Sequence, residues 1–262
     1  MKKRLDAHLH EAGYFGSRNR AQAAVMEGLV SVDGRTDVKP GTQVTGAEDI
    51  KLLDKACPFV SRGGIKLAGA LEDLGLEVSG RAALDVGSST GGFTDCLLQA
   101  GASSVIAVDV GKGQLHARLR EDARVTVLEG VNARDIEKVE LPGRPELAVI
   151  DVSFISLRKV LEPVWRVLAA DGVILALVKP QFEAGMGKAP KGVVRDRAIH
   201  LEVLNGLAAW LDEKGFSLRG VAPSRLKGPK GNVEFFMLID RGTGKRAGPG
   251  DIAEAVRRAG AI

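Results

Sequence analysis

The chain has 262 residues, 45% apolar and 4% aromatic, enough to bury the core of one large domain or of one large and one small domain. Its net charge of +4 is a mild basic excess, which permits nucleic acid as a partner without establishing it. Two cysteines without metal-like spacing indicate a reducing compartment, no signal peptide precedes the first helix, and no apolar run approaches the ~18 residues of a membrane span. We therefore expect a soluble, cytoplasmic protein that does not enter membranes.

The first sixty residues predict a small module of two short helices and a hairpin. Apolar residues recur at helical spacing up to Gly13, and Ser17 is a good N-cap for a second helix. Residues 29–32 alternate like a short strand, and Asp33-Gly34 follows as the hairpin turn. Because such short elements bury little surface alone, we expect a compact satellite of a larger domain.

Strands and helices alternate from residue 82 onward, which predicts a mostly parallel sheet covered by helices, an α/β fold. The predicted strands are 82–86, 105–109, 125–128, 147–151, 173–178, 218–222 and 235–240. The predicted helices are 93–99, 113–119, 157–168, 199–214 and a short tail helix around 252–258. Ligands bind such sheets outside the carboxyl ends of the parallel strands, so polar residues at those ends are the candidates for function.

A turn of small residues joins the first strand of this sheet to its first helix, where backbone N–H groups can face a nucleotide-sized ligand. Its glycines, Gly87, Gly91 and Gly92, do not form the Gly-x-Gly-x-x-Gly pattern of a dinucleotide site. Asp85, near the end of the strand, would repel a pyrophosphate but could accept a hydrogen bond or face a cation. These features favour S-adenosylmethionine, which has an amino acid at one end and a nucleoside at the other, over a nicotinamide cofactor.

The second strand ends in Asp109, where an acid can bind the two ribose hydroxyls of a nucleoside. Asp109 follows Asp85 by 24 residues, close to the ~20 expected within one βαβ unit. Asn132, just past the third strand, is placed to contact the adenine edge. The alternative interpretation is that Asp109 caps a helix and the glycines only close a turn. The predicted cofactor-binding residues are Asp85, Gly87, Ser88, Ser89, Gly91, Gly92, Phe93, Asp109, Val110 and Asn132.

Four polar residues lie at strand ends or in loops where stability alone would favour other residue types. Asp151 ends the fourth predicted strand and Lys179 ends the fifth. Lys66 precedes the first strand, and Glu234 begins the last. Burial and a second cation, Lys66, would make the Lys179 ammonium easier to deprotonate and so create a base, although Asp151 opposes this. The alternative is that these residues form ordinary surface salt bridges.

Five ordered motifs cover nearly the whole chain. They are Val60-Ser61-Arg62-Gly63-Gly64, Asp85-Val86-Gly87-Ser88-Ser89-Thr90-Gly91-Gly92-Phe93-Thr94, Asp151-Val152-Ser153-Phe154-Ile155-Ser156, Val178-Lys179-Pro180-Gln181-Phe182-Glu183 and Gly231-Asn232-Val233-Glu234-Phe235. Together they resemble the TlyA family of ribosomal RNA 2′-O-methyltransferases, an FtsJ-like class that is also labelled hemolysin. The resemblance implies a Rossmann-like methyltransferase sheet, mostly parallel with an antiparallel last strand. It also implies a Lys-Asp-Lys-Glu catalytic tetrad at Lys66, Asp151, Lys179 and Glu234.

The resemblance further implies that the N-terminal module, a small α+β domain, binds RNA. The predicted RNA contacts are Lys3, Arg4, Arg18, Arg20 and Arg62. Basic and acidic residues are nearly balanced in residues 1–60, so an RNA-binding surface requires the positive charges to gather on one face. The alternative is an ordinary solvated helix face.

We therefore predict a monomeric enzyme that uses S-adenosylmethionine to methylate a ribose 2′-hydroxyl, of a cytidine, in ribosomal RNA or a ribosomal subunit. The predicted organisation is an RNA-binding module at 1–58, a linker at 59–64, a methyltransferase domain at 65–242 and a tail with a short helix at 243–262. The four histidines show no ligand spacing, so we expect no metal. The alternatives are an RNA-binding ribosome assembly factor, a membrane-active hemolysin and a nicotinamide-linked oxidoreductase.

Overall fold

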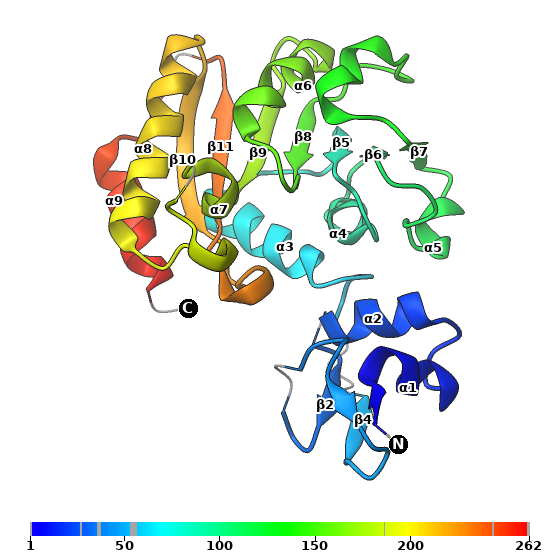
Figure 1. The fold of residues 1–262 in the computed structure, drawn as a ribbon. Helices are drawn as coiled ribbons and strands as arrows, with labels where there is room; N and C mark the ends of the chain where they lie inside the picture. The colour runs from blue at the N-terminus through cyan, green and yellow to red at the C-terminus, as the bar shows by residue number, and fades with distance from the viewer. Residues whose placement is uncertain are drawn as a thin grey trace. The chain divides into compact units, whose positions relative to one another are not determined.

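Two compact units, Met1–Cys57 and Pro58–Ile262, make up the chain in a computed structural model (Figure 1). The structure describes residues 2–26, 28–35, 38–52, 57–185, 187–242 and 244–260. Parts of the tail predicted at 243–262 therefore lie outside the described residues. The boundaries predicted for the domains, the linker and the tail stay predictions.

The smaller unit contains two helices and two short antiparallel strand pairs. Its elements are β1 (Lys3–Arg4), α1 (Leu5–Glu11), α2 (Arg18–Met26), β2 (Val30–Val32), β3 (Gln43–Val44) and β4 (Ile50–Leu52). Strand β1 pairs with β3, and β2 pairs with β4. The Ser17 hydroxyl accepts a hydrogen bond from the Arg20 N–H at 3.3 Å, which confirms the predicted N-cap. Positive φ angles of 51° at Asp33 and 78° at Gly34 confirm the predicted hairpin turn.

The larger unit is built on a seven-stranded sheet with the order β10-β11-β9-β8-β5-β6-β7. Its strands are β5 (Ala82–Val86), β6 (Ser104–Asp109), β7 (Val125–Glu129), β8 (Leu147–Ile150), β9 (Val173–Val178), β10 (Ser217–Pro223) and β11 (Phe235–Asp240). Strand β11 runs antiparallel to β9 and β10, whereas the pairs from β9 to β7 are all parallel. The prediction of a mostly parallel sheet with an antiparallel last strand is confirmed.

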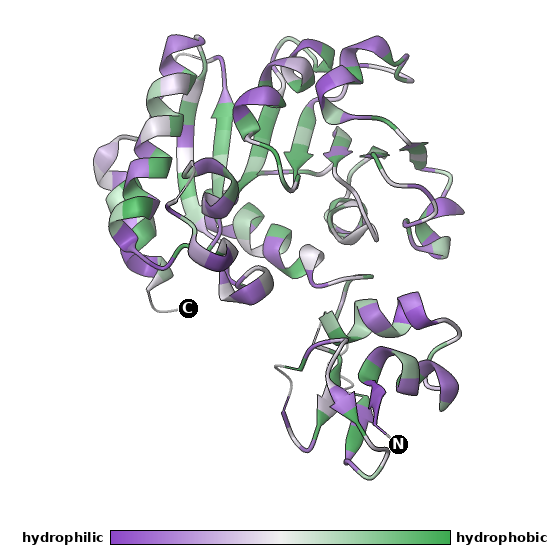
Figure 2. Cartoon of the chain, in the orientation of Figure 1, coloured by the Kyte–Doolittle hydropathy of each residue, from purple (hydrophilic) through white to green (hydrophobic). Residues whose placement is uncertain are grey.

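Helices cover both faces of this sheet (Figure 1). The α-helices are α3 (Gly63–Leu74), α4 (Gly92–Gln99), α5 (Ala117–Arg120), α6 (Leu161–Val167), α7 (Pro180–Glu183), α8 (Arg197–Glu213) and α9 (Pro249–Ala259). The 3₁₀-helices are η1 (Ala133–Lys138), η2 (Leu157–Lys159), η3 (Pro190–Gly192) and η4 (Pro229–Gly231). Buried residues of α3 and α4 pack on one face, and those of α6, α8 and α9 pack on the other. Figure 2 shows the apolar strands between these layers.

Several helices differ from the prediction, and the short helices α7, η1, η3 and η4 were not predicted. The helix predicted at 113–119 begins only at Ala117, because Gly113 takes a positive φ of 68° that interrupts a helix. The helix predicted at 157–168 divides into η2 and α6, and Pro163 lies in the first turn of α6, where its missing N–H is tolerated. Helix α3 was not predicted, because the two glycines at its start read as part of a linker.

The strand alternation directs polar residues toward the α3 and α4 layer. On four parallel strands, the last buried apolar residue of this face is followed two positions later by a polar residue, which falls on the same face. The pairs are Ala83 and Asp85, Ala107 and Asp109, Val149 and Asp151, and Leu177 and Lys179. On the antiparallel β11, Glu234 precedes Phe236 of the same face by two positions. The sheet thereby gathers these polar side chains at one edge.

Candidate active site

Lys66 and Glu234 form a buried ion pair between α3 and the start of β11. The Lys66 ammonium donates to Glu234 Oε2 at 2.7 Å, and the side chains are 13% and 0% exposed. The second oxygen, Glu234 Oε1, is buried and has no hydrogen-bond partner among the described residues. Because removing two charges from water costs several kcal/mol per ion, such a pair is weak evidence for stability. We expect its role to be functional.

Lys179 and Asp151 form a second ion pair beyond the ends of β9 and β8. The Lys179 Nζ atom lies 2.5 Å from Asp151 Oδ1 and donates to the Ser153 hydroxyl at 2.8 Å. The lysine side chain is 11% exposed and the aspartate 24%, so a substrate can reach this pair.

The topology makes the two pairs neighbours. Phe235 of β11 is registered opposite Val178 of β9, so the next positions outward on these antiparallel strands are Glu234 and Lys179. The Asp151 N–H donates to the Val86 carbonyl at 2.9 Å, which attaches the second pair to the strand of the glycine turn. The structure thus brings together all four residues predicted to be catalytic.

The glycine turn after β5 depends on its glycines for close packing. Gly87 has a φ of 88°, and a Cβ atom there would lie 2.3 Å from the Asp151 carbonyl oxygen. Gly91 has a φ of 98°, and a Cβ atom on Gly92 would lie 2.2 Å from the Ser61 hydroxyl. These approaches show that the glycines serve the packing of the site itself, and their contact with a cofactor stays a prediction.

Asp85 is a fully buried acid beneath this turn. Its Oδ2 accepts a hydrogen bond from the Thr94 hydroxyl at 2.6 Å, while Oδ1 is buried without a partner among the described residues. Burial raises the pKa of the Asp85 carboxyl to about 7, and repulsion from Asp151 acts in the same direction although the Thr94 hydrogen bond opposes it. An unpartnered buried oxygen is costly and indicates a site that a polar ligand completes.

Asp109 joins the glycine turn to the loop that follows β6. Its Oδ2 accepts from the Ser89 N–H at 2.8 Å, and its Oδ1 accepts from the Gly111 N–H at 2.7 Å. Neither bond caps a helix, in contrast to the alternative raised from the sequence. The carboxylate is held in place beside Val110, which is 70% exposed.

The other predicted cofactor residues are placed less directly. Phe93 is buried in the core, with its ring centroid 6.1 Å from that of Phe236, and Ser88 is buried as well. The Asn132 side-chain oxygen accepts from the Arg134 N–H at 3.1 Å and so caps η1. Their contacts with a cofactor stay predictions.

Two residues near the site were not predicted from the sequence, and both connect the loop after β8 with α7. Phe154 is 90% exposed at a φ of 64°, and its ring lies 5.0 Å from that of Phe182. Glu183 accepts from the Ser156 hydroxyl and the Leu157 N–H, both at 2.7 Å, and burial raises its pKa. The only sequence signal was that both lie in motifs that also carry a predicted catalytic residue.

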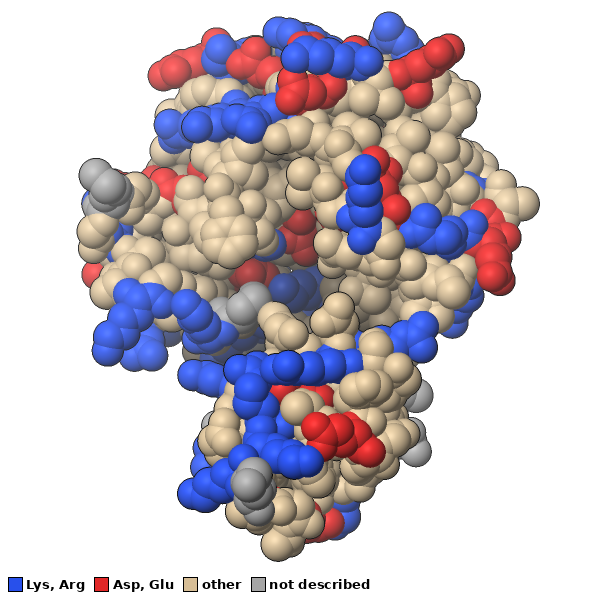
Figure 3. Space-filling model, turned by 45° about the vertical axis from the view of Figure 1, so that its right-hand side comes forward, with Lys and Arg blue, Asp and Glu red and all other residues tan. Residues whose placement is uncertain are grey.

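Two of the RNA contacts predicted in the smaller unit, Arg4 and Arg18, lie beside Asp6, which is 1% exposed. Arg4 donates to it through two bonds of 3.0 and 2.7 Å, and Arg18 approaches to 3.4 Å, so one carboxylate holds two guanidinium groups. The hydrogen bonds from Arg4 lower the pKa of Asp6 to about 2. Lys3 pairs with Glu11, and Arg20 lies exposed on α2. Figure 3 shows Lys and Arg side chains over much of the visible surface of this unit.

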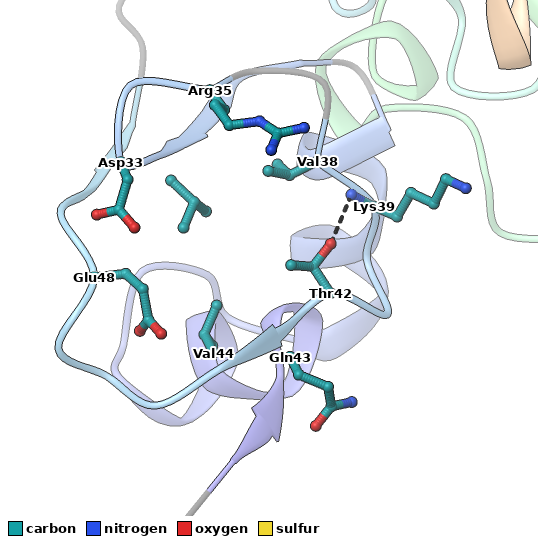
Figure 4. A pocket seen from close by; sticks show the side chains of 9 residues that line it. Asp33, Arg35, Val38, Lys39, Thr42, Gln43, Val44 and Glu48 are labelled. Carbon is teal, nitrogen blue, oxygen red and sulfur yellow. Dashed lines mark hydrogen bonds between the residues drawn. The ribbon is translucent and has the colours of Figure 1, made fainter.

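Arg62 lies in the other unit, at the N-terminal end of α3. A separate hollow of about 450 Å³ lies beside the strands of the smaller unit (Figure 4). Both acidic and basic side chains line it, among them Asp33, Lys39 and Glu48, and its one drawn hydrogen bond runs from the Lys39 N–H to the Thr42 hydroxyl at 3.0 Å. This mixture favours no single class of ligand.

The described residues contain neither a cluster of metal ligands nor a helix suited to span a membrane. No three His, Cys, Asp or Glu side chains gather there as a metal ion would require. None of the described helices combines the length and apolar character that a bilayer crossing needs.

Comparison with known proteins places this geometry in a family. The model of the FtsJ-like methyltransferases matches residues 59–241, and that of the S4 domain matches residues 3–50. The chain is 42% identical over 260 residues, 98% of its length and 97% of the relative's, to the 16S/23S rRNA (cytidine-2′-O)-methyltransferase TlyA of Mycobacterium tuberculosis. It is 36% identical over 239 residues, 84% of its length and 92% of the relative's, to the 23S rRNA (cytidine-2′-O)-methyltransferase TlyA of Campylobacter jejuni.

A solved structure from Streptococcus thermophilus, described as a candidate hemolysin, has a TM-score of 0.79 and 40% identity, with 99% of this chain and 96% of that chain covered. A methyltransferase sheet therefore carries the two lysine–carboxylate pairs. The chain belongs to the FtsJ-like methyltransferases and, among them, to the TlyA proteins.

Proposed function

We propose that the chain transfers a methyl group from S-adenosylmethionine to the 2′-hydroxyl of a cytidine in ribosomal RNA. The observation that carries this proposal is the meeting of two lysine–carboxylate pairs, Lys66–Glu234 and Lys179–Asp151, at the strand edge that holds the glycine turn. The names of the TlyA relatives supply the nucleoside and the RNA class.

The residues around the glycine turn fit the cofactor. The Asp109 carboxylate is fixed by two backbone N–H groups and keeps lone pairs that can accept from ribose hydroxyls. The unpartnered oxygen of Asp85 suits the ammonium of the amino-acid end, because a nearby cation would favour its charged form. When bound, S-adenosylmethionine supplies an already activated methyl group.

The four polar residues then have distinct tasks on the ribose. Lys179 first releases a proton to solvent, and its neutral Nζ then accepts the proton of the 2′-hydroxyl. Asp151 and Ser153 fix the direction of that nitrogen. Lys66 and Glu234 hold the ribose, since Glu234 Oε1 has no partner among the described residues and Lys66 retains further N–H donors. Positioning supplies much of the acceleration, because the transfer neutralises charge rather than creating it.

The substrate is recognised at two places. The S4 domain contributes Arg4, Arg18 and Arg20 to phosphates of folded RNA. Phe154, exposed in the loop that follows β8 and carries Asp151, offers a ring on which an unstacked base can lie. We propose that the protein acts as a cytoplasmic monomer on ribosomal RNA or ribosomal subunits.

The test incubates purified ribosomal subunits, free ribosomal RNA and intact ribosomes with methyl-labelled cofactor. We expect transfer by the wild type, loss of transfer by Lys179→Ala, and retention by Lys138→Ala, a matched removal of an exposed lysine. No transfer by the wild type to any RNA would refute the enzymatic proposal and favour an assembly factor. Undiminished transfer by Lys179→Ala would refute the assignment of the base.

A further inference from the structure

Two identical tripeptides, Pro-Lys-Gly, form the 3₁₀-turns η3 and η4 in different parts of the chain. Both central lysines take the left-handed conformation, with φ of 56° at Lys191 and 61° at Lys230, and the glycines after them have φ of 75° and 80°. A lysine rarely adopts such angles, and strained backbone of this kind clusters at functional sites. We call residues 189–192 and 228–231 the twin turns.

The twin turns are fastened side by side. The Lys230 ammonium donates to the Lys191 carbonyl at 3.2 Å. Asn232, which is 2% exposed, donates to the Gly192 carbonyl at 2.9 Å and accepts from the Val194 N–H at 3.0 Å. Because a buried amide bridges both loops, the backbones of the two turns are held at a fixed separation.

The second turn lies directly against the candidate active site. A Cβ atom on Gly228 would lie 1.9 Å from Glu234 Oε1, so this backbone closely approaches the carboxylate that pairs with Lys66. The Gly228 N–H also donates to the Asn232 carbonyl at 2.8 Å. A ligand bound on the turn at residues 228–231 therefore lies close to a ligand bound at Glu234.

Exposed cations without carboxylate partners lie on the twin turns or within three residues of them in the sequence. They are Lys191, Arg195, Lys227 and Lys230. No ion pair joins any of these four to a carboxylate within the part of the chain that the structure describes, whereas neighbouring Lys188 is paired with Glu202. Unpaired like charges repel one another, so the cluster favours a polyanion that neutralises it.

We propose that the twin turns bind the sugar–phosphate backbone of the RNA strand beside the target ribose. The inference rests on the proposed function and adds to it the surface that grips the substrate strand. Each lysine or arginine that meets a phosphate releases counterions, so binding here contributes directly to the salt dependence of RNA affinity. The hydrogen bonds that hold the two turn backbones together reduce the loss of conformational freedom on RNA binding.

The test is the double variant Lys191→Gly with Lys230→Gly. Glycine accepts the left-handed angles, so two charges are removed while the backbone angles of the turns are kept. The bond from Lys230 to the Lys191 carbonyl is lost, but the two hydrogen bonds of Asn232 still join the turns. Labelled ribosomal RNA is titrated at several salt concentrations without cofactor, and cofactor binding is measured separately by calorimetry. We expect weaker RNA binding, a salt slope shallower by about 0.7 to 0.9 for each lost contact, and unchanged cofactor affinity.

Two control variants make the result specific. Lys138→Ala with Lys245→Ala removes two exposed lysines elsewhere in the same unit and should leave the slope near that of the wild type. Lys191→Arg with Lys230→Arg keeps the charges and should retain binding. An unchanged slope in the glycine double variant, or an equal change in the alanine control, overturns the inference. A different result would refute the proposed function: a wild-type protein that binds RNA but transfers no methyl group to it.

Discussion

Asp85→Asn isolates the energetic cost of the buried carboxyl beneath the glycine turn. The pKa of Asp85 is raised from 3.8 to about 7, mainly by burial. Between these values the folded state holds a proton that the unfolded state has lost, so the contribution of Asp85 to stability falls as the pH rises from about 4 to 7. The full difference corresponds to at most about 4 kcal/mol, since each pKa unit is worth about 1.36 kcal/mol. Asparagine resembles the neutral acid and can still accept from Thr94.

The assay is urea unfolding of both proteins from pH 4.5 to 7.5, followed by tryptophan fluorescence. Both tryptophans, Trp165 and Trp210, belong to the larger unit, so the signal reports the unfolding of that unit alone. We expect the free energy of unfolding of Asp85→Asn, relative to that of the wild type, to increase steadily as the pH rises. Asp122→Asn is the control, because hydrogen bonds from Arg124 lower the pKa of that half-buried acid to about 2, below this window. If the difference in unfolding free energy between Asp85→Asn and the wild type stays constant with pH, the assignment of a raised pKa to Asp85 is refuted.

Three further predictions concern other parts of the molecule. Phe154→Gly should raise the thermal midpoint of unfolding, because glycine accepts the φ of 64°. The same variant should raise the KM for RNA several-fold in a methylation assay without changing cofactor affinity, because it loses the ring on which a base stacks. Glu183→Ala leaves the Ser156 hydroxyl and the Leu157 N–H without their acceptor, so we expect a loss of roughly 1–3 kcal/mol in stability and a lower kcat, read by unfolding and by single-turnover transfer. The pKa of Asp6 is lowered to about 2, so its stabilising contribution is complete above pH 4 and is lost as the pH falls toward 2. When unfolding of Asp6→Asn and of the wild type is followed by circular dichroism, the difference in their stability should become smaller as the pH falls.

The sheet could be predicted from the sequence because most of its strands consist mainly of apolar residues and alternate with helical segments. The strands at 82–86, 173–178 and 235–240 were predicted with their observed bounds. Helix α3 could not be predicted in the same way, because Gly63 and Gly64 disfavour a helix and are retained for close packing. A Cβ atom on Gly64 would lie 2.2 Å from the Phe59 ring, a contact between residues that no local pattern reveals.

The candidate site was predictable in its residue types but not in its pairing. Strand-end position alone indicated Asp151 and Lys179, since the carboxyl ends of parallel strands converge. The bond between Lys66 and Glu234 spans 168 positions of sequence and depends on where α3 packs, which required the fold. Phe154 was missed because an exposed aromatic residue in a loop has no periodicity that distinguishes it.

The alternation that builds the core also places the chemistry. Val149 and Leu177 are buried on the face covered by α3 and α4, and extending the same period by one step assigns Asp151 and Lys179 to that face at the edge of the sheet. A shift of one residue in either strand would turn its polar group to the opposite layer, where α6 and α8 pack. The register that buries the apolar residues is therefore the same constraint that joins lysine to carboxylate, so substitutions that alter the strand register should abolish activity together with stability.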